Sequence, residues 1–282
     1  MILVQIACFF AEQLAREIRI FVPMQKELTM RKRSCLLGIL VGTLFLTAAC
    51  SRQKPAPEAD SSDFVNITDV VPDAILEARY FGTYNFVGQR IDGYLEPTAL
   101  LTREAADSLK AVSDDVKKQG YRLKIYDAYR PQCAVDHFVR WGKDLSDTLM
   151  RPYFYPDVDK SLLFVRGYIA EKSGHSRGST LDLTLFDMAS GKELDMGGVH
   201  DWFGIESHPD YGGDPETLEH QDPEKLTAEQ FRNRMILREA MLRHGFLPYD
   251  CEWWHFTLAN EPYPDTYFTF PVKTLEKKYL HI

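Results

Sequence analysis

Apolar residues between Thr102 and Gly120 recur every three or four positions, which predicts an amphipathic helix ended by a left-handed glycine. The residues at this spacing are Ala105, Leu109, Val112 and Val116. The stretch that follows, Tyr121–Asp127, alternates between polar and apolar positions and predicts a half-buried strand. Pro131 suits the first turn of a helix, so a second helix is expected from there through Phe138.

The second half of the chain has the same mixture of patterns. Leu181-Asp-Leu-Thr-Leu185 alternates strictly, so one face of this strand carries leucine and the other Asp182 and Thr184. Thr227-Ala-Glu-Gln230 is a capping box that predicts a helix ending at Gly245. The aromatic stretch Pro248–His255 predicts a final core strand. This mixed order, without a regular βαβ repeat, predicts one compact α+β domain with a central, mainly antiparallel sheet flanked by helices.

The N-terminal residues follow a different pattern. Arg31-Lys-Arg33 precedes an apolar run from Cys35 to Leu46 and the small residues Thr-Ala-Ala-Cys50, the order found in secretory signals. The run is shorter than the roughly 20 residues that a membrane-spanning helix needs. Because Ala48-Ala49 before Cys50 resembles a bacterial lipobox, we expect a lipoprotein-type signal at 30–49 and lipidation of Cys50. An ordinary cleaved signal is the alternative.

These features divide the chain into four parts. Residues 1–29 place a second apolar and charged stretch before a complete signal, so we expect translation to start at Met30. Residues 50–63 are polar and contain two prolines, as a disordered tether does. Residues 64–282 have the size of one domain. We therefore expect a periplasmic protein that contacts the membrane only through a lipid anchor at Cys50.

The net charge limits the possible binding partners, and the cysteines bear on whether a disulfide forms. The formal net charge of −8 makes a nucleic-acid backbone an unsuitable partner. Two of the five cysteines fall in residues 1–49, and Cys50 is the lipidation candidate. Cys133 and Cys251 remain. Outside the cytoplasm they can pair as a disulfide or stay as two free thiols, and the sequence leaves both open.

Two short stretches about eighty residues apart carry the groups of a catalytic metal site. They are Ser173-Gly-His175-Ser-Arg-Gly-Ser-Thr-Leu-Asp182 and Glu252-Trp-Trp-His255. Together they offer two imidazoles, one carboxylate ligand and one carboxylate to act as general base, which is the inventory of a catalytic zinc site. Gly174 and Gly178 let the backbone fold tightly enough to bring His175 and Asp182 to one ion. The alternative is a surface histidine and a solvent-facing aspartate.

Glu252 and His255 point to opposite faces of a regular strand, so a bulge or a strand end is needed to bring both into one cavity. The alternative is a core strand whose two polar side chains are satisfied by hydrogen bonds. The adjacent tryptophans favour burial, and a buried carboxylate needs a partner. A zinc-bound water is such a partner if Glu252 accepts its proton.

Two further features of the sequence are candidates for functional groups, an arginine and a second set of histidines. Arg130 lies where a predicted strand ends and a helix begins, a place from which an arginine can clamp an oxyanion or a carboxylate. The alternative is a surface ion pair with Asp127.

His208 and His220 lie among aspartates in the stretch 206–222 and form a rival candidate metal site. Its prolines and glycines favour an irregular, solvated loop instead.

These motifs resemble those of VanX-type D-alanyl-D-alanine dipeptidases, a family related to D,D-carboxypeptidases. Ser173–Asp182 resembles the family's Ser-x-His-x6-Asp element, and Glu252–His255 its Glu-Trp-Trp-His element. The resemblance extends over most of the domain. Further matching stretches are Glu77-Ala-Arg-Tyr80, Asn85-Phe-Val-Gly88, Asp127-Ala-Tyr-Arg-Pro131, Met196-Gly197 with Asp201, Glu261-Pro-Tyr-Pro264 and Phe270-Pro-Val-Lys273.

The resemblance implies one zinc ion per chain, in a cleft at the sheet. It implies His175, Asp182 and His255 as ligands, Glu252 as the base, Arg130 as the oxyanion stabiliser, Ser173 as a holder of the substrate carboxylate, and Asp201 and Tyr80 as holders of the substrate ammonium. The expected activity is hydrolysis of D-alanyl-D-alanine to two D-alanines in cell-wall peptide turnover. A free dipeptide is a zwitterion, so one anion holder and one cation holder at a fixed separation select it.

Two alternative functions stay open. A zinc D,D-carboxypeptidase acting on peptidoglycan stem peptides would use the same chemistry with an open amine-side pocket. A non-catalytic zinc domain that binds wall fragments needs neither Glu252 nor Arg130. The chain also departs from the family in its leader and in a longer loop from Ile205 to Pro223, which we expect to shape the mouth of the cleft.

Overall fold

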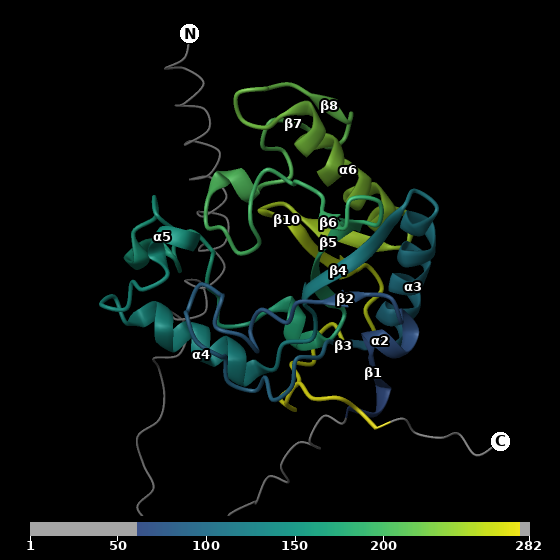
Figure 1. The fold of residues 1–282 in the computed structure, drawn as a ribbon. Helices are drawn as coiled ribbons and strands as arrows, with labels where there is room; N and C mark the ends of the chain where they lie inside the picture. The colour runs from purple at the N-terminus through teal and green to yellow at the C-terminus, as the bar shows by residue number, and fades with distance from the viewer. Residues whose placement is uncertain (1–60, 277–282) are drawn as a thin grey trace, which may run out of the picture. The chain divides into compact units, whose positions relative to one another are not determined.

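The computed structural model describes residues 61–276, which form an α+β unit around a six-stranded sheet (Figure 1). The expected translation start, signal peptide and lipidated Cys50 lie outside the described residues, and the domain boundaries stay predictions. The strands of the sheet are β2 (Ile75–Leu76), β4 (Tyr121–Asp127), β5 (Thr180–Asp187), β10 (Glu252–Leu258) and β9 (Phe246–Tyr249), in that spatial order, with β6 (Lys192–Glu193) pairing with β5.

The sheet is mainly antiparallel, as the sequence predicts. β2 pairs with β4 in parallel, and the other pairings are antiparallel. Two small antiparallel pairs lie outside it: β1 (Phe64–Asn66) with β3 (Leu100–Thr102), and β7 (Gly213–Asp214) with β8 (Glu219–His220). The predicted α+β class is confirmed.

The longer helices begin where the sequence predicts. The helices are α2 (Ile67–Val70), α3 (Arg103–Lys117), α4 (Gln132–Lys143), α5 (Arg151–Phe154) and α6 (Ala228–Arg243), with 3-10 turns η1 (Ser61–Asp63), η2 (Lys160–Leu162), η3 (Gly174–Arg177) and η4 (Ile205–Ser207). The capping box is formed at α6, because the hydroxyl of Thr227 accepts from the backbone N–H of Gln230 and the Gln230 side chain accepts from that of Thr227. The predicted boundaries of α3 and α6 are confirmed within one or two residues.

The leucines of β5 and the polar residues between them face opposite ways. Leu181, Leu183 and Leu185 join a core that also contains apolar side chains of α3 and α6. Asp182 and Thr184 alternate with them and therefore point to the other face of the sheet, as expected. A second, mainly aromatic core surrounds α4. In Figure 1, α4 and α5 lie on one side of the sheet region and α3 on the other.

The prediction of one strand over Pro248–His255 is wrong. β9 ends at Tyr249, Asp250 and Cys251 form a turn, and β10 starts at Glu252. The two strands form an antiparallel hairpin whose register shifts between Glu252 and Phe256. Aromatic residues continue through both strands, which hides the turn in the apolar pattern. The turn places Glu252 at a strand end.

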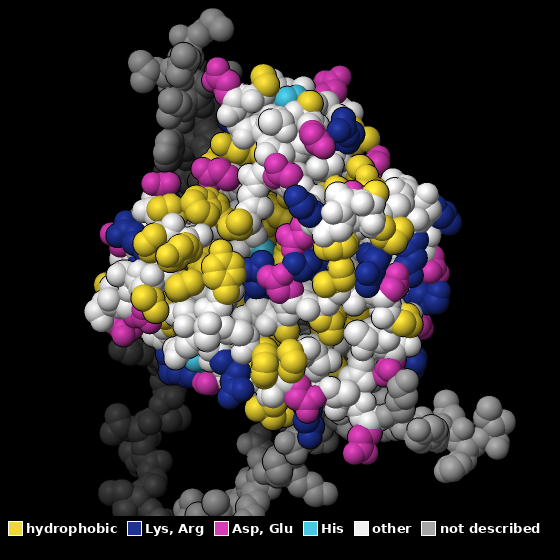
Figure 2. Space-filling model, viewed as in Figure 1, with side chains coloured by type: hydrophobic (Ala, Val, Ile, Leu, Met, Phe, Trp, Pro, Cys, Tyr) yellow, Lys and Arg dark blue, Asp and Glu magenta, His cyan; other side chains and the backbone are white. Residues whose placement is uncertain are grey.

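The surface and the cysteines complete the description. In Figure 2, hydrophobic side chains gather on the left of the face shown, whereas acidic and basic side chains intermingle at its centre. Cys133 and Cys251 are free and half-buried, so the disulfide alternative is not formed. Within residues 61–276, no helix is both long enough and apolar enough to cross a membrane.

Candidate active site

His175 is held in one orientation by its own turn. Ser173 caps η3, because its hydroxyl accepts from the backbone N–H of His175 at 3.3 Å. The ring Nδ1 lies 2.7 Å from the carbonyl oxygen of Ala128, so Nδ1 carries the proton and donates. Nε2 is thereby left with a lone pair directed at the cavity, the arrangement expected of a metal-binding imidazole.

Asp182 and His255 approach His175 from the sheet. They lie directly opposite each other on the paired strands β5 and β10. Asp182 is 2% exposed and His175 1%, which rules out the alternative of a surface histidine and a solvent-facing aspartate. The oxygen Oδ1 of Asp182 is buried and accepts no hydrogen bond, so a strong acceptor faces the cavity beside the two histidine rings.

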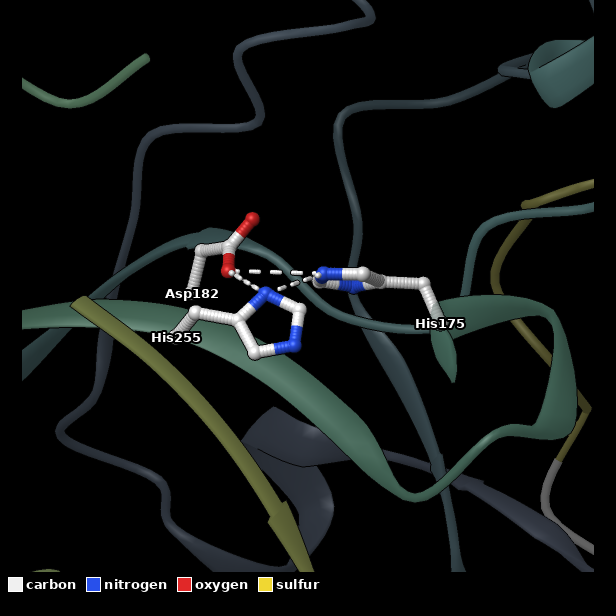
Figure 3. Close-up of side chains that lie close together, drawn as sticks. All are labelled: His175, Asp182 and His255. Atoms are coloured by element: carbon white, nitrogen blue, oxygen red, sulfur yellow. Dashed lines mark hydrogen bonds and ion pairs between the residues drawn. The ribbon is translucent and has the colours of Figure 1, made fainter. Parts of the chain in front are cut away.

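The three candidate ligand atoms form a nearly equilateral triangle (Figure 3). His175 Nε2 lies 3.4 Å from Asp182 Oδ1, His255 Nδ1 lies 3.2 Å from the same oxygen, and the two nitrogens are 3.3 Å apart. Tetrahedral bonds of about 2.0–2.1 Å separate neighbouring ligand atoms by about 3.3 Å. The triangle therefore fits one face of a four-coordinate metal site, with the fourth position open to the cavity.

Glu252 reaches the same cavity because of the strand irregularity. It is the first residue of β10, where the register with β9 shifts. Its Oε2 lies 3.2 Å from His255 Nδ1, so both side chains point the same way despite their spacing. The expected requirement for a strand end or a bulge is thus met, and the carboxylate lies beside the metal triangle without belonging to it.

Arg130 forms the ion pair with Asp127 and is also placed where it could clamp an oxyanion. Its Nε lies 2.8 Å from Asp127 Oδ2, so the ion pair that would mark a surface arginine is present. The side chain is nevertheless only 12% exposed, and its Nη2 lies 3.5 Å from Asp182 Oδ2. The guanidinium also stacks over the rings of Tyr80 and Phe138. A cation fixed in this way can stabilise negative charge that develops beside the metal triangle.

Tyr80 and Asp201, predicted to hold an ammonium group, lie together. The hydroxyl of Tyr80 lies 3.1 and 3.0 Å from the two carboxylate oxygens of Asp201, and both residues are buried. Asp201 has a φ of 65°, a left-handed conformation that costs a non-glycine residue about 1–2 kcal/mol. Surrounding contacts must hold it there.

One cavity collects all the predicted site residues of the domain. Its volume is about 220 Å³, and its lining includes His175, Asp182, His255, Glu252, Arg130, Ser173, Asp201 and Tyr80. Sites for drug-sized ligands occupy about 300–1,000 Å³, so this cavity suits a smaller molecule. The structure brings these residues together, and their individual roles stay predictions.

Burial and mutual charges set the ionisation of the three candidate ligands. Burial lowers the pKa of His175, with a further contribution from the Arg130 guanidinium, so the ring is neutral. Burial would raise the pKa of Asp182, but the surrounding imidazoles outweigh it and hold that pKa well below its usual value. Burial lowers the pKa of His255, and the carboxylates of Asp182 and Glu252 more than compensate, raising it to about 9. A metal bound through Nδ1 of His255 at neutral pH would therefore displace a proton from that ring.

The pKa of Asp201, the predicted ammonium holder, is shifted upward instead. Burial raises the pKa of Asp201 to about 6, against the influence of His200. Burial, followed by the charge of Asp201, also raises the pKa of Tyr80 well above its usual value, so Tyr80 remains a hydrogen-bond donor. A substrate cation would relieve the desolvation of Asp201 by pairing with it.

The rival metal site is not assembled. His208 is 4.0 Å from Asp210, and His220 bonds the carbonyl oxygen of Leu226. The loop instead lines a second cavity of about 430 Å³, through Ile205, Glu206 and His208. This cavity shares Tyr168, Phe203, Tyr249 and Glu252 with the first, so the loop borders the mouth of the site as expected.

The sequence analysis missed two supporting residues, Arg234 and His200, and named a third, Asp127, only as an alternative partner of Arg130. Asp127 receives the Tyr94 hydroxyl at 2.6 Å as well as Arg130, and so fixes the guanidinium. Arg234, which is 1% exposed, donates to the carbonyls of Met196, Glu206 and His208 and ties the loop that carries Asp201 to α6. His200 lies between Asp182 and Asp201. Nothing in the spacing of Arg234 or His200 signals their contacts.

Substitution of Gly178 by alanine is expected to destabilise the fold by about 2–5 kcal/mol. Gly178 has a φ of 84°, which costs alanine about 1–2 kcal/mol. A Cβ there would also collide with the ring of Phe64, and overpacking adds about 1–3 kcal/mol. Urea unfolding measures the difference. Gly191→Ala is the matched control, since Gly191 has a φ of 68° but open space around it. Equal losses in the two variants would remove the packing argument.

Two imidazoles and a carboxylate around an open metal position, with a free carboxylate and a fixed arginine beside them, define the site of a metal-dependent hydrolase. Comparison with known proteins identifies the kind. The model of the D-ala-D-ala dipeptidase family matches residues 60–273, and the chain belongs to this family of metallopeptidases.

Several curated relatives carry the same description over nearly their whole length. The chain is 38% identical over 212 residues to a D-alanyl-D-alanine dipeptidase of Streptomyces coelicolor, covering 75% of this chain and 99% of that protein. It is 36% identical over 210 residues to one from Enterococcus faecium, covering 74% and 98%. It is 30% identical over 202 residues to one from Escherichia coli, covering 72% and 88%. The family resemblance is confirmed.

Proposed function

We propose that this protein hydrolyses D-alanyl-D-alanine to two D-alanines with one zinc ion. The observation that carries the proposal is the small cavity in which a metal triangle, a free carboxylate and a buried ammonium holder meet. Two nitrogens and one oxygen at tetrahedral spacing suit zinc. The names of the relatives support the choice of substrate.

Zinc in this site would lower the pKa of a bound water to about 7 and polarise the scissile carbonyl. The residues of the chain supply the rest. Glu252 accepts the proton of the attacking water and passes it to the leaving amine. Arg130 stabilises the oxygen that gains negative charge when the carbonyl is attacked. Ser173 lines the cavity and would hold the substrate carboxylate.

Selectivity for a free dipeptide would come from Asp201 and Tyr80. A buried carboxylate left without a cation is costly, whereas the free ammonium of a dipeptide satisfies it. A stem peptide has an amide at that position and offers no positive charge. Asp201 therefore favours the dipeptide over longer substrates.

A D,D-carboxypeptidase is the second candidate. The adjoining cavity of about 430 Å³ shares its wall with the site and has room for a longer peptide. The test is release of free D-alanine by the zinc-loaded protein from D-alanyl-D-alanine, from its N-acetylated form and from a pentapeptide stem. Cleavage of the free dipeptide alone supports the dipeptidase. Equal or better cleavage of the blocked substrates makes the protein a carboxypeptidase.

The ammonium contact predicts a particular pH dependence. Asp201 must be ionised to attract the substrate, and its pKa is about 6. The KM for the free dipeptide is therefore expected to rise as pH falls through 6, by about tenfold for each unit below it. In Asp201→Asn the KM is expected to be higher and to lose this rise. Steady-state kinetics between pH 5 and 8 check both. An unchanged KM profile in the variant would remove Asp201 from the ammonium site.

We further propose that the enzyme acts at the periplasmic face of a membrane, in cell-wall peptide turnover. The signal-like residues 30–49 and the lipobox-like Ala48-Ala49-Cys50 support this location. A tethered enzyme outside the cytoplasm suits the salvage of wall fragments. Mass spectrometry of the mature N-terminus tests it: a diacylglyceryl group on Cys50 supports the proposal, and an unmodified N-terminus at another residue opposes it.

A further inference from the structure

One buried imidazole lies between the metal triangle and the ammonium holder. The side chain of His200 is completely buried. Its Nε2 lies 3.4 Å from Oδ2 of Asp182, and its Nδ1 lies 3.4 Å from Oδ2 of Asp201. A single ring thus separates a candidate metal ligand from the carboxylate predicted to bind the substrate ammonium.

The ring has little freedom to move. It stacks on Tyr126 with ring centroids 4.6 Å apart and planes 28° apart, and Trp254 packs edge-on at 5.2 Å. Both aromatic side chains are at most 3% exposed. Interiors this closely packed transmit displacements, so a shift of the imidazole would move both carboxylates.

The contact with Asp182 involves the oxygen that does not face the histidine ligands. Oδ1 of Asp182 is the atom nearest to His175 and His255, whereas Oδ2 is approached by His200 and by Arg130. A donor on the outer oxygen of a metal-binding carboxylate orients the inner oxygen toward the ion. His200 is placed to provide this orientation.

The contact with Asp201 supports a strained residue. Asp201 directly follows His200 and has a φ of 65°. Its carboxylate is held by Tyr80 on one side and approached by His200 on the other. The imidazole therefore helps to set where the ammonium of a substrate binds relative to the carbonyl at the metal.

We propose that His200 is a positioning residue that fixes the separation between the metal site and the ammonium site, and so restricts the enzyme to dipeptides. It touches neither the metal nor the substrate. Its two contacts have separable effects: Nε2 donates to Asp182 and orients it for metal binding, and the packed ring, whose Nδ1 makes no hydrogen bond, holds Asp201 in place for the ammonium. The second effect rests on the proposed function, and the first does not.

Three variants separate the two effects. His200→Phe keeps an aromatic ring for the stacking on Tyr126 and removes both nitrogens. His200→Gln can place an amide donor near the position of Nε2 but lacks the ring, and His200→Asn lacks both the ring and a donor at that position. Zinc affinity is measured by competition with a chromogenic chelator, which needs no activity. The KM for D-alanyl-D-alanine and the preference for it over the N-acetylated form are measured separately.

In His200→Phe, which keeps the ring, zinc affinity is expected to fall by about 10–100-fold while the preference for the free dipeptide is largely kept. His200→Gln is expected to keep most of the zinc affinity and to lose about tenfold of the preference. His200→Asn is expected to lose both. His244→Phe, just after the end of α6 and near Asp115, is the matched control and should change neither quantity.

Two results would overturn the proposal. One is a His200→Phe protein with unchanged zinc affinity. The other is an equal loss of both quantities in the Phe and Gln variants, which would mark His200 as part of the packing only. If the wild-type protein cleaves no dipeptide, the proposed function fails, while the zinc measurements still decide the role of Nε2.

Discussion

Glu252→Gln is expected to abolish dipeptide hydrolysis while the protein still binds its metal. The carboxylate lies beside the metal triangle, 3.2 Å from His255, but is not one of its three members. An amide of the same shape cannot accept the proton of the attacking water. General base catalysis contributes about 10²–10⁴-fold, so kcat is expected to fall by about a thousandfold or more with a modest change in KM.

The measurement is D-alanine release together with zinc content in the same preparation. Glu229→Gln is the matched control, because Glu229 is exposed in the first turn of α6, away from the cavity lining. A Glu252→Gln protein that retains a tenth of the activity would show that another group removes the proton. Loss of zinc together with activity would instead make Glu252 a ligand.

Asp182→Asn is expected to lose the metal itself. The substitution replaces the anionic member of the triangle with a neutral amide, and it removes the negative charge that faces His175, His255 and Arg130. Zinc affinity is expected to fall by about a hundredfold or more, since disturbing only the residues that support a ligand already costs 10–100-fold. Hydrolysis falls with it at limiting zinc.

Chelator competition and activity at a series of zinc concentrations check this result. Asp187→Asn provides the matched control on the same strand, where the carboxylate caps the turn after β5. The assignment of Asp182 as a ligand would be lost if the variant bound zinc as tightly as the unmodified protein. Partial recovery of activity at high zinc would support the assignment, because it shows that the rest of the site is intact.

Local sequence patterns correctly predicted the strands and helices that depend on near neighbours in sequence. The strand Tyr121–Asp127 and the capped helix after Thr227 have the expected limits, because alternation and capping depend on neighbours in sequence. The prediction of a single strand over Pro248–His255 was wrong because both strands of the hairpin are rich in apolar residues. A turn at Asp250 and Cys251 has no glycine or proline to mark it.

The candidate site was predictable as a set of residues but not as an arrangement. The two motifs and the family resemblance indicate which side chains to consider. Their meeting depends on the pairing of β5 with β10 and on the register shift after Glu252, and neither follows from residue spacing. His200 and Arg234 support the site through contacts with distant segments, which leave no local pattern.

The order of the strands has a consequence for how the protein matures. Two candidate ligands lie on η3 and β5, but the third, His255, lies on β10, the last strand of the sheet in sequence. A chain in which β4 and β5 have already paired still lacks a complete metal triangle. The three candidate ligands come together only when β10 docks beside β5, so a chain cut short before His255 is expected to bind no metal at this site.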